Sequence, residues 1–313
     1  MTNRHAHQRV GMLFLIYFVA ACASTPQTRL LSENPPDIPQ LVELSEVPFN
    51  PQIEYYCGPA ALASIISYRG IAVSPEQLGP LIYVPGLKGS LQAEVVSATR
   101  QFDLLPVELD GRLDSILREI AAGNPVFVLQ NLGLDIAPVW HYEVVIGYDI
   151  DAGIFILRSG EHKRIYREFA VFERVWQRAG YWALSIVDAR SIPASANEQR
   201  YLDAVIDMES VGRVETARIA YQTAIVRWPQ STLALTGLGN TAYAMNDYAE
   251  AEVAFQAALD INPLQPSLWN NLAYTLAQLG RNQPSLAAIK QAIQLDPENQ
   301  NFKDSLDELV SWQ

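Results

Sequence analysis

The chain has 313 residues, of which 49% are hydrophobic and only 18% are charged, and its formal net charge is −12. This length suggests about two domains, and the composition excludes an intrinsically disordered chain. Nucleic acid is not an expected partner, because no cluster of Lys and Arg follows residue 10 to bind phosphates.

The N-terminal segment, residues 1–21, is typical of an export signal. It combines Arg4 and Arg9 with an apolar run of twelve residues, and a bilayer-spanning helix needs roughly 20 residues. The run ends in VAAC, and the small residues before Cys22 resemble the lipobox of bacterial lipoproteins, in which the cysteine is lipidated and becomes the first residue. We therefore expect a lipoprotein signal peptide over 1–21 and a lipid anchor at Cys22. The alternative is an ordinary signal peptide cleaved nearby, with Cys22 incidental.

The segment after this cysteine bears on the localisation. Ala23 stands where Asp would favour retention in the inner membrane of a bacterial envelope, so by resemblance we expect an outer-membrane lipoprotein that faces the periplasm. Residues 22–40 are rich in Pro and polar residues and are expected to form a flexible tether.

Residues 41–190 carry helix patterns first and strand patterns afterwards. Ser74 and Gln77 form a capping box around Pro75, and helical periodicity follows over 90–102 and 113–123. Short β-like runs come next, at 126–132, 141–149, 153–159 and 181–187. The sequence DIDAG predicts a hairpin turn between the second and third runs. Helices followed by antiparallel strands indicate an α+β domain.

The C-terminal third, residues 198–313, repeats with a period of 34 residues. This offset aligns Ala224 with Ala258 and Ala292, and a proline recurs five residues after each of them. Gly212, Asn246 and Gly280 share one turn position, where left-handed geometry favours Gly or Asn. The pattern resembles the tetratricopeptide repeat. It predicts an all-α solenoid of three repeats, over 198–231, 232–265 and 266–299, with a capping helix over 300–313 and a linker over 191–197. Asp and Glu outnumber Lys and Arg in residues 198–313. This acidic module is therefore expected to bind a protein partner through a basic or apolar segment.

One stretch of the first domain, QIEYYCGPAALASI, places Cys57 at the start of an apolar helix. Amides and the helix dipole at a helix N-terminus stabilise a thiolate, which predicts a pKa of Cys57 below the ordinary value of about 8.5. If Cys22 carries lipid, Cys57 has no disulfide partner. The other interpretation is a buried structural cysteine.

A base and an oxyanion donor are needed to use that thiol. His141 opens the strand HYEVVIGYD, whereas His162 lies in the polar sequence GEHKR. Gln52 precedes Cys57 by five residues, and its amide together with the Cys57 backbone N–H would form an oxyanion hole. No metal-ligand spacing is present, so neither a metal nor another cofactor is expected.

Together, PQIEYYCGPAALASI and HYEVVIGYD resemble the motifs of the papain-like cysteine peptidases that process bacteriocin double-glycine leaders. The resemblance covers about residues 45–187. It implies a papain-like cysteine peptidase fold for 41–190, with Cys57 as the nucleophile, His141 as the general base and Gln52 as the oxyanion donor. It also implies an Asp that orients the histidine, but the matching position is Ser159. Ser159, Asp149 and Asp151 all remain candidates for this role.

Two functions are compatible with these residues. The first is a membrane-anchored cysteine peptidase that cleaves a peptide or protein substrate, or transfers its acyl group to an acceptor other than water. The second is a weakly active or inactive peptide-binding scaffold, which the replacement of the acidic orienter by Ser159 favours. The intact set of Gln52, Cys57 and His141 favours the enzyme.

Overall fold

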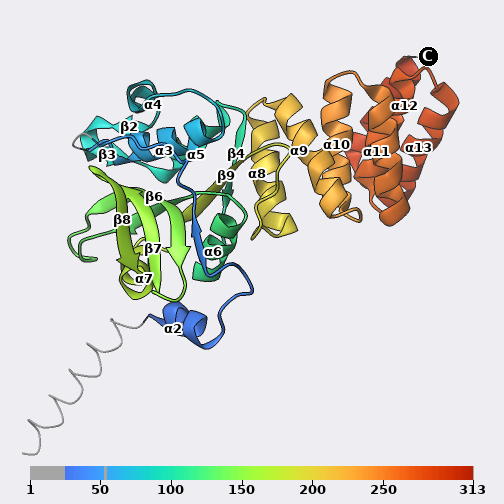
Figure 1. The fold of residues 1–313 in the computed structure, drawn as a ribbon. Helices are drawn as coiled ribbons and strands as arrows, with labels where there is room; N and C mark the ends of the chain where they lie inside the picture. Colours follow the sequence, from blue (N-terminus) through green and yellow to red (C-terminus); the bar gives the residue numbers. More distant parts are fainter. Residues whose placement is uncertain (1–24, 53–54, 313) are drawn as a thin grey trace, which may run out of the picture. The chain divides into compact units, whose positions relative to one another are not determined.

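The computed structural model describes residues 25–52 and 55–312 (Figure 1). The predicted signal peptide and Cys22 lie outside the described residues. No helix in the described part is long and apolar enough to cross a membrane. The chain divides into two compact units. The first comprises the residues up to Ala98 together with Glu108–Ile186, and the second comprises Thr99–Val107 and the chain from Val187 onward.

An antiparallel sheet forms the centre of the first unit. Its strands lie in the order β9-β5-β6-β7-β8, and β1 pairs with the distal half of β6. The strands are β1 (Leu41–Glu43), β5 (Val126–Asn131), β6 (Trp140–Asp149), β7 (Ile154–Ser159), β8 (His162–Glu168) and β9 (Ala183–Asp188). Four of these strands coincide with the predicted β-like runs to within two residues at each end, whereas β1 and β8 were not predicted. The short β1 and the strongly charged β8 carry too weak a hydrophobic alternation to signal a strand.

Two helices, α6 (Leu113–Ala121) and α7 (Phe169–Gln177), cover one face of this sheet. Strand side chains alternate between faces, so Val126, Val145 and Phe155 point to this side and form one buried cluster with apolar residues of both helices. The other short elements of the unit are α4 (Pro75–Ile82), β2 (Tyr83–Val84), the 3-10 helix η1 (Pro85–Leu87), β3 (Gly89–Ser90) and α5 (Gln92–Arg100).

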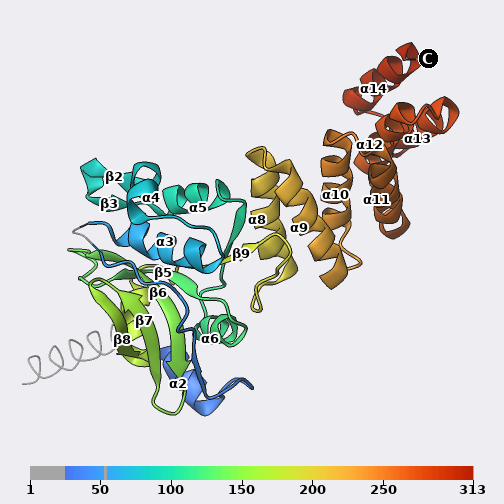
Figure 2. The ribbon, with the colours of Figure 1, turned by 45° about the horizontal axis from the view of Figure 1, so that its top comes forward.

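Helix α3 (Cys57–Tyr68) packs on the opposite face, against β6 (Figure 2). Its sequence has no charged residue, and every residue from Gly58 to Ile66 is buried. A helix that is apolar on all sides is stable only inside a core. Helices on both faces of an antiparallel sheet confirm the predicted α+β class, and they fix the N-terminus of α3 beside the beginning of β6.

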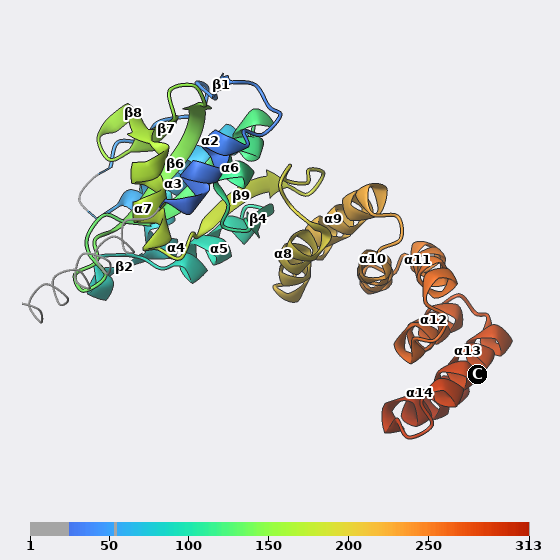
Figure 3. The ribbon, with the colours of Figure 1, turned by 90° about the horizontal axis from the view of Figure 1, so that it is seen from below.

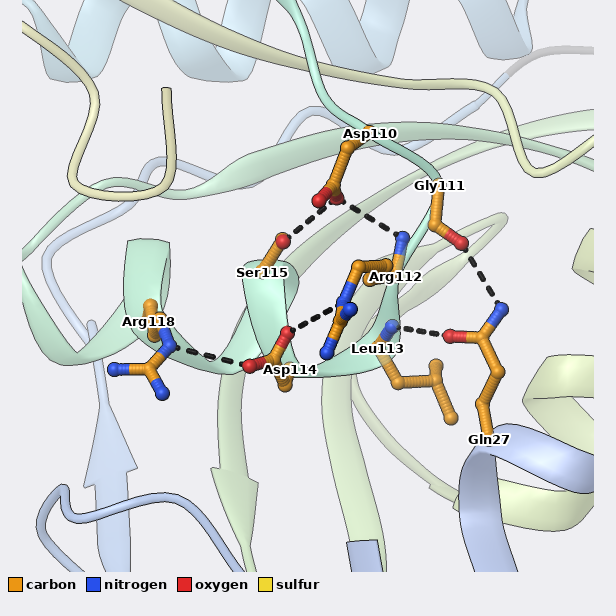
Figure 4. A network of polar contacts seen from close by, with 8 residues as sticks. All are labelled: Gln27, Asp110, Gly111, Arg112, Leu113, Asp114, Ser115 and Arg118. Carbon is orange, nitrogen blue, oxygen red and sulfur yellow. Dashed lines mark hydrogen bonds and ion pairs between the residues drawn. The ribbon is translucent and has the colours of Figure 1, made fainter. Parts of the chain in front are cut away.

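Within the range predicted as a flexible tether, residues Pro26–Glu33 form helix α2. The carboxylate of Glu173 accepts hydrogen bonds from the backbone N–H groups of Gln27 and Thr28, at 2.9 and 2.7 Å. The Gln27 side chain donates to the Gly111 carbonyl and accepts from the Leu113 N–H, at the start of α6 (Figure 4). Composition alone gave no sign of these contacts, because a carboxylate 145 residues away satisfies the amides at the N-terminus of α2.

The second unit is helical apart from most of β4 (Leu104–Glu108) and the end of β9, and its helices pack against one another in succession (Figure 3). Close packing between successive helices depends on small residues, and a Cβ on Gly239 would lie 2.5 Å from the Phe255 ring. The shared turn residues have the expected left-handed backbone, with φ of +81°, +63° and +71° at Gly212, Asn246 and Gly280. The helices are α8 (Glu198–Ser210), α9 (Val214–Arg227), α10 (Thr232–Ala244), α11 (Tyr248–Ile261), α12 (Pro266–Gln278), α13 (Asn282–Leu295) and α14 (Gln300–Ser311). The predicted all-α class of this region is confirmed.

Candidate active site

Helix α3 begins at Cys57, which places the thiol at the N-terminus of a buried helix. The chain turns into this helix through Tyr55, whose φ of 65° is left-handed and unusual for a residue with a side chain. Gly58 is required for close packing, because a Cβ there would lie 2.5 Å from the Oγ of Ser90. The thiol is partly buried and unpaired.

Cys57, His141 and Gln52 line one cavity of about 1060 Å³ in the first unit. The structure therefore brings together the predicted nucleophile, base and oxyanion donor, although they come from α3, β6 and a loop. Exposed apolar side chains form much of the cavity wall, and they belong to Leu87, Leu91, Val139 and Trp140.

The backbone of Gln52 is fixed by the turn between β7 and β8. Its N–H donates to the Gly160 carbonyl at 3.2 Å. The preceding loop is held by Arg158, a buried residue of β7 whose guanidinium donates to the carbonyls of Ser45 and Val47. One turn thus connects the segment carrying Gln52 to the strand that carries Ser159.

A hydrogen-bond chain runs from His141 through Ser159 to Glu143. His141 Nε2 and Ser159 Oγ are 3.0 Å apart, and Ser159 Oγ donates to Glu143 Oε1 at 2.5 Å. The same carboxylate oxygen lies 3.5 Å from His141 Nε2. The side chain of His141 is 17% exposed and that of Glu143 only 1%, so this chain is largely shielded from water.

This chain determines which histidine nitrogen acts as the base. The single hydroxyl proton of Ser159 goes to the carboxylate of Glu143, which only accepts hydrogen bonds when ionised. Ser159 Oγ must then accept from His141, so the imidazole proton resides on Nε2. Nδ1 is left with its lone pair free to receive a proton from a thiol.

Sequence reasoning missed Glu143, although a signal was present. Glu143 is the one charged residue within HYEVVIGY, a run that is otherwise apolar after its histidine. It stands two positions after His141, and alternation along a strand puts both side chains on the same face. The sequence left Asp149 and Asp151 open as orienters of His141. Asp149 lies eight residues farther along β6, about 26 Å away at the usual rise per residue, and Asp151 lies in the turn beyond it.

Burial disfavours the charged forms of both Cys57 and His141. Burial raises the pKa of the Cys57 thiol, and the Glu143 charge acts in the same direction, while the backbone N–H groups of Tyr142 and Gly58 oppose it. Burial lowers the pKa of His141, opposed by Glu143 and assisted by Arg167. The sequence predicted a lowered pKa for Cys57, and this was wrong in direction because desolvation outweighs the donors at the helix N-terminus. Both shifts favour the neutral forms of the thiol and the imidazole.

No group of three or more His, Cys, Asp or Glu side chains that could hold a metal ion occurs in residues 25–52 and 55–312. The cavity itself is lined by the partly buried thiol of Cys57 and the imidazole of His141.

Comparisons with known proteins found matches for both parts of the chain. The model of the peptidase C39 like family matches residues 44–184, and a tetratricopeptide repeat model matches residues 236–300. No curated protein matches the chain. A solved structure of a putative C39-like peptidase from Bacillus anthracis is 20% identical, covers 48% of this chain and 98% of its own, and has a TM-score of 0.40.

A type III secretion chaperone from Yersinia enterocolitica, SycD in complex with a peptide of the translocator YopD, is 19% identical over 36% of this chain and 87% of its own, with a TM-score of 0.34. The two family-model matches confirm both resemblances seen in the sequence. Residues 44–184 thus form a peptidase C39 like domain, and residues 236–300 belong to tetratricopeptide repeats.

Proposed function

We propose that the first domain is a cysteine peptidase that attacks a peptide carbonyl with Cys57. The observation that carries this proposal is the chain His141–Ser159–Glu143, which keeps Nδ1 of His141 unprotonated and available as a base. An acidic orienter fixes the tautomer of a catalytic histidine and stabilises its charge. Glu143 does this here through the hydroxyl of Ser159.

The reaction follows from these positions. Cys57 Sγ attacks the carbonyl carbon while its proton passes to His141 Nδ1, because a neutral pair must transfer the proton during attack. The amide of Gln52 and the backbone N–H of Cys57 stabilise the oxyanion. His141 then protonates the leaving amine, and a thioester on Cys57 remains. Water completes hydrolysis, whereas an amine acceptor would give acyl transfer.

The cavity walls favour a substrate with apolar side chains next to the reacting carbonyl. Leu87 is 61% exposed, Val139 56% and Trp140 53%, and all three line the same cavity as Cys57. Burying such side chains against an apolar peptide segment would stabilise the complex through the hydrophobic effect.

A peptide-binding scaffold is the second candidate. The raised pKa of Cys57 and the lowered pKa of His141 favour it, since both oppose a standing ion pair. The complete hydrogen-bond chain behind His141 favours the enzyme, because binding alone does not require a defined tautomer.

Labelling with a peptidyl chloromethylketone, a probe that alkylates an activated thiol, tests the proposal directly. We expect wild-type protein to be labelled at about pH 7, Cys57→Ala not to be labelled, and His141→Ala to be labelled at least tenfold more slowly, as is usual for loss of a general base. Equal labelling of wild type and His141→Ala would reject the enzyme and leave the scaffold.

For the whole chain we further propose a lipid anchor at Cys22, a location at the outer membrane facing the periplasm, and recruitment of a protein partner by the repeats. The VAAC sequence supports the anchor. Tetratricopeptide repeats present extended surfaces that suit a protein partner. An anchored enzyme with such a module would act on substrates brought to the membrane surface.

A further inference from the structure

Behind His141 lies a set of buried polar atoms that have no hydrogen-bond partner among the described residues. They are Oε1 and Nε2 of Gln130, Oε2 of Glu143 and Nε of Arg167. Buried polar groups are nearly always paired, so each exception calls for a physical explanation. Gln130 is the clearest case, because its residue is 0% exposed and neither end of its amide is paired.

The strand register places Gln130 directly against the proposed active site. Gln130 on β5 pairs with His141 on β6, and Glu143 pairs with Val128, two residues before Gln130. Directly opposed and diagonal residues of neighbouring antiparallel strands project from the same face, and long side chains reach across the diagonal. Gln130 and Glu143 therefore share one face of the sheet with His141.

The unpaired atoms are complementary in character. Glu143 Oε1 already accepts from Ser159, while its Oε2 needs a donor. The amide nitrogen of Gln130 has two hydrogens to donate, and its buried position offers them no other protein acceptor. A carboxylate that receives more hydrogen bonds is held more firmly in its charged form.

We infer that Gln130 is a positioning residue of this site, which supplies the missing hydrogen bond to Oε2 of Glu143 through one buried water molecule. This rests on the proposed function, because the hydrogen bond would stabilise the imidazolium that His141 forms during thiol attack. Gln130 orients the carboxylate of Glu143, Glu143 holds Ser159, and Ser159 holds His141.

The charged groups around His141 come from several elements, and Gln130 adds a donor without adding charge. Cys57 on α3 faces the cavity, and Glu161 in the β7–β8 turn lines it. Arg167 on β8 lowers the pKa of His141. Arg178, just after α7, donates to the carbonyl of Asn131, next to Gln130. A further cation beside His141 would oppose the imidazolium, whereas a neutral amide supports it indirectly.

The test measures the rate of Cys57 alkylation by iodoacetamide across the pH range in the full chain. Gln130→Met removes the donor at nearly constant volume. We expect it to slow alkylation near pH 7 by about three- to tenfold, the range that corresponds to the net contribution of one typical hydrogen bond. In the background of Glu143→Gln, the same substitution should have no further effect, because Gln130 acts only through the carboxylate. Glu119→Gln, at a buried carboxylate that accepts from Ser185 on β9, is the matched control and should leave the rate unchanged.

Two results of the alkylation experiment would overturn the inference. One is an unchanged rate in Gln130→Met, and the other is an equal slowing with and without the Glu143 carboxylate. Should Gln130→Met fold poorly, Gln130→Leu provides a second apolar variant for the same comparison.

A second measurement separates failure of this inference from failure of the proposed function. In Cys57→Ala protein, NMR titration of His141 reads the imidazolium without any thiol chemistry. Gln130→Met should lower the pKa of His141 by about half a unit or more. Without the hydrogen bond from Gln130, the Glu143 carboxylate is held less firmly and stabilises the imidazolium less. If His141→Ala has no effect on alkylation but this shift is present, the proposed peptidase fails while the role of Gln130 stands. If the shift is absent, the role of Gln130 is rejected.

Discussion

Ser159 donates its hydroxyl proton to Glu143 at 2.5 Å while its oxygen lies 3.0 Å from Nε2 of His141. A serine and a glutamate on neighbouring strands thus lie behind His141, where the family resemblance implies a single aspartate. The carboxylate is supplied from β6 and the direct contact to the imidazole from β7. This relationship makes the site sensitive to the direction of the hydrogen bonds as well as to charge.

Substitutions at Glu143 test that direction. In Glu143→Gln the amide can donate to Ser159, which then donates to Nε2 of His141 and forces the imidazole proton onto Nδ1. We expect labelling of Cys57 by the peptidyl probe to fall by about 10²-fold or more, as for other histidines held in the wrong tautomer. Glu143→Asp keeps an acceptor and should lose less. Equal labelling of Glu143→Gln and wild type would show that Glu143 does not act on His141.

The fold was largely predictable, because its main signals are local. The 34-residue period depends on small residues such as Ala258 and on turn residues such as Asn246, and these positions are visible in the sequence. The helix at Cys57 and the strand at His141 were equally clear from their apolar patterns. In contrast, α2 was not predictable, because Glu173 supplies the partners of its first amides from far along the chain.

The contact between Ser159 and His141 depends on a pairing between strands that sequence spacing does not give. Ser159 reaches His141 because β7 pairs with β6, with a register shift between Val145 and Gly147 of β6. Nothing in the residues near Ser159 indicated that its hydroxyl would meet a carboxylate from the strand of the histidine itself. The pKa of Cys57 was mispredicted for a similar reason, because the extent of burial is a property of the assembled core.

The repeat module offers a test of packing. Ala258 is 0% exposed and belongs to the core cluster of the second unit with Phe255 and Leu272. Ala258→Leu should overpack α11 and destabilise this unit by about 1–3 kcal/mol. Urea denaturation of the full chain, followed by circular dichroism at a helix-sensitive wavelength, measures the change. Val253→Leu, at a site 70% exposed, is the control and should leave the midpoint unchanged.

The proposed lipid anchor predicts that replacing Cys22 moves the protein out of the membrane fraction. Cys22→Ser removes the thiol that would carry the lipid, so radiolabelled palmitate should no longer enter the protein and the protein should leave the membrane fraction. Cys57→Ser alters the other cysteine of the chain and should keep both the label and the location. Incorporation of palmitate into Cys22→Ser would show that the anchor lies elsewhere.

The lowered pKa of His141 predicts a dependence of stability on pH. Burial is the main cause of the lowering, so the folded chain binds a proton at His141 less readily than the unfolded chain, whose histidines titrate near about 6.5. Between the lowered value and about 6.5 the unfolded state binds more protons, and the free energy of unfolding therefore rises with pH through this window and levels off above it. Urea midpoints at several pH values should show this rise in wild type and a smaller one in His141→Gln. Identical slopes of urea midpoint against pH in the two proteins would contradict a lowered pKa at His141.

The most demanding test moves the carboxylate from position 143 to position 159. Ser159→Asp alone would place a second carboxylate beside the buried Glu143, and two close carboxylates share one proton because both cannot ionise. We expect this variant to be labelled more slowly than wild type and to unfold at a lower urea concentration. Adding Glu143→Gln removes the repulsion and leaves a single carboxylate, at position 159, next to Nε2 of His141. The double variant should regain at least the wild-type labelling rate, although each single variant is slower. If the two single effects simply add in the double variant, Ser159 and Glu143 do not form one unit behind His141.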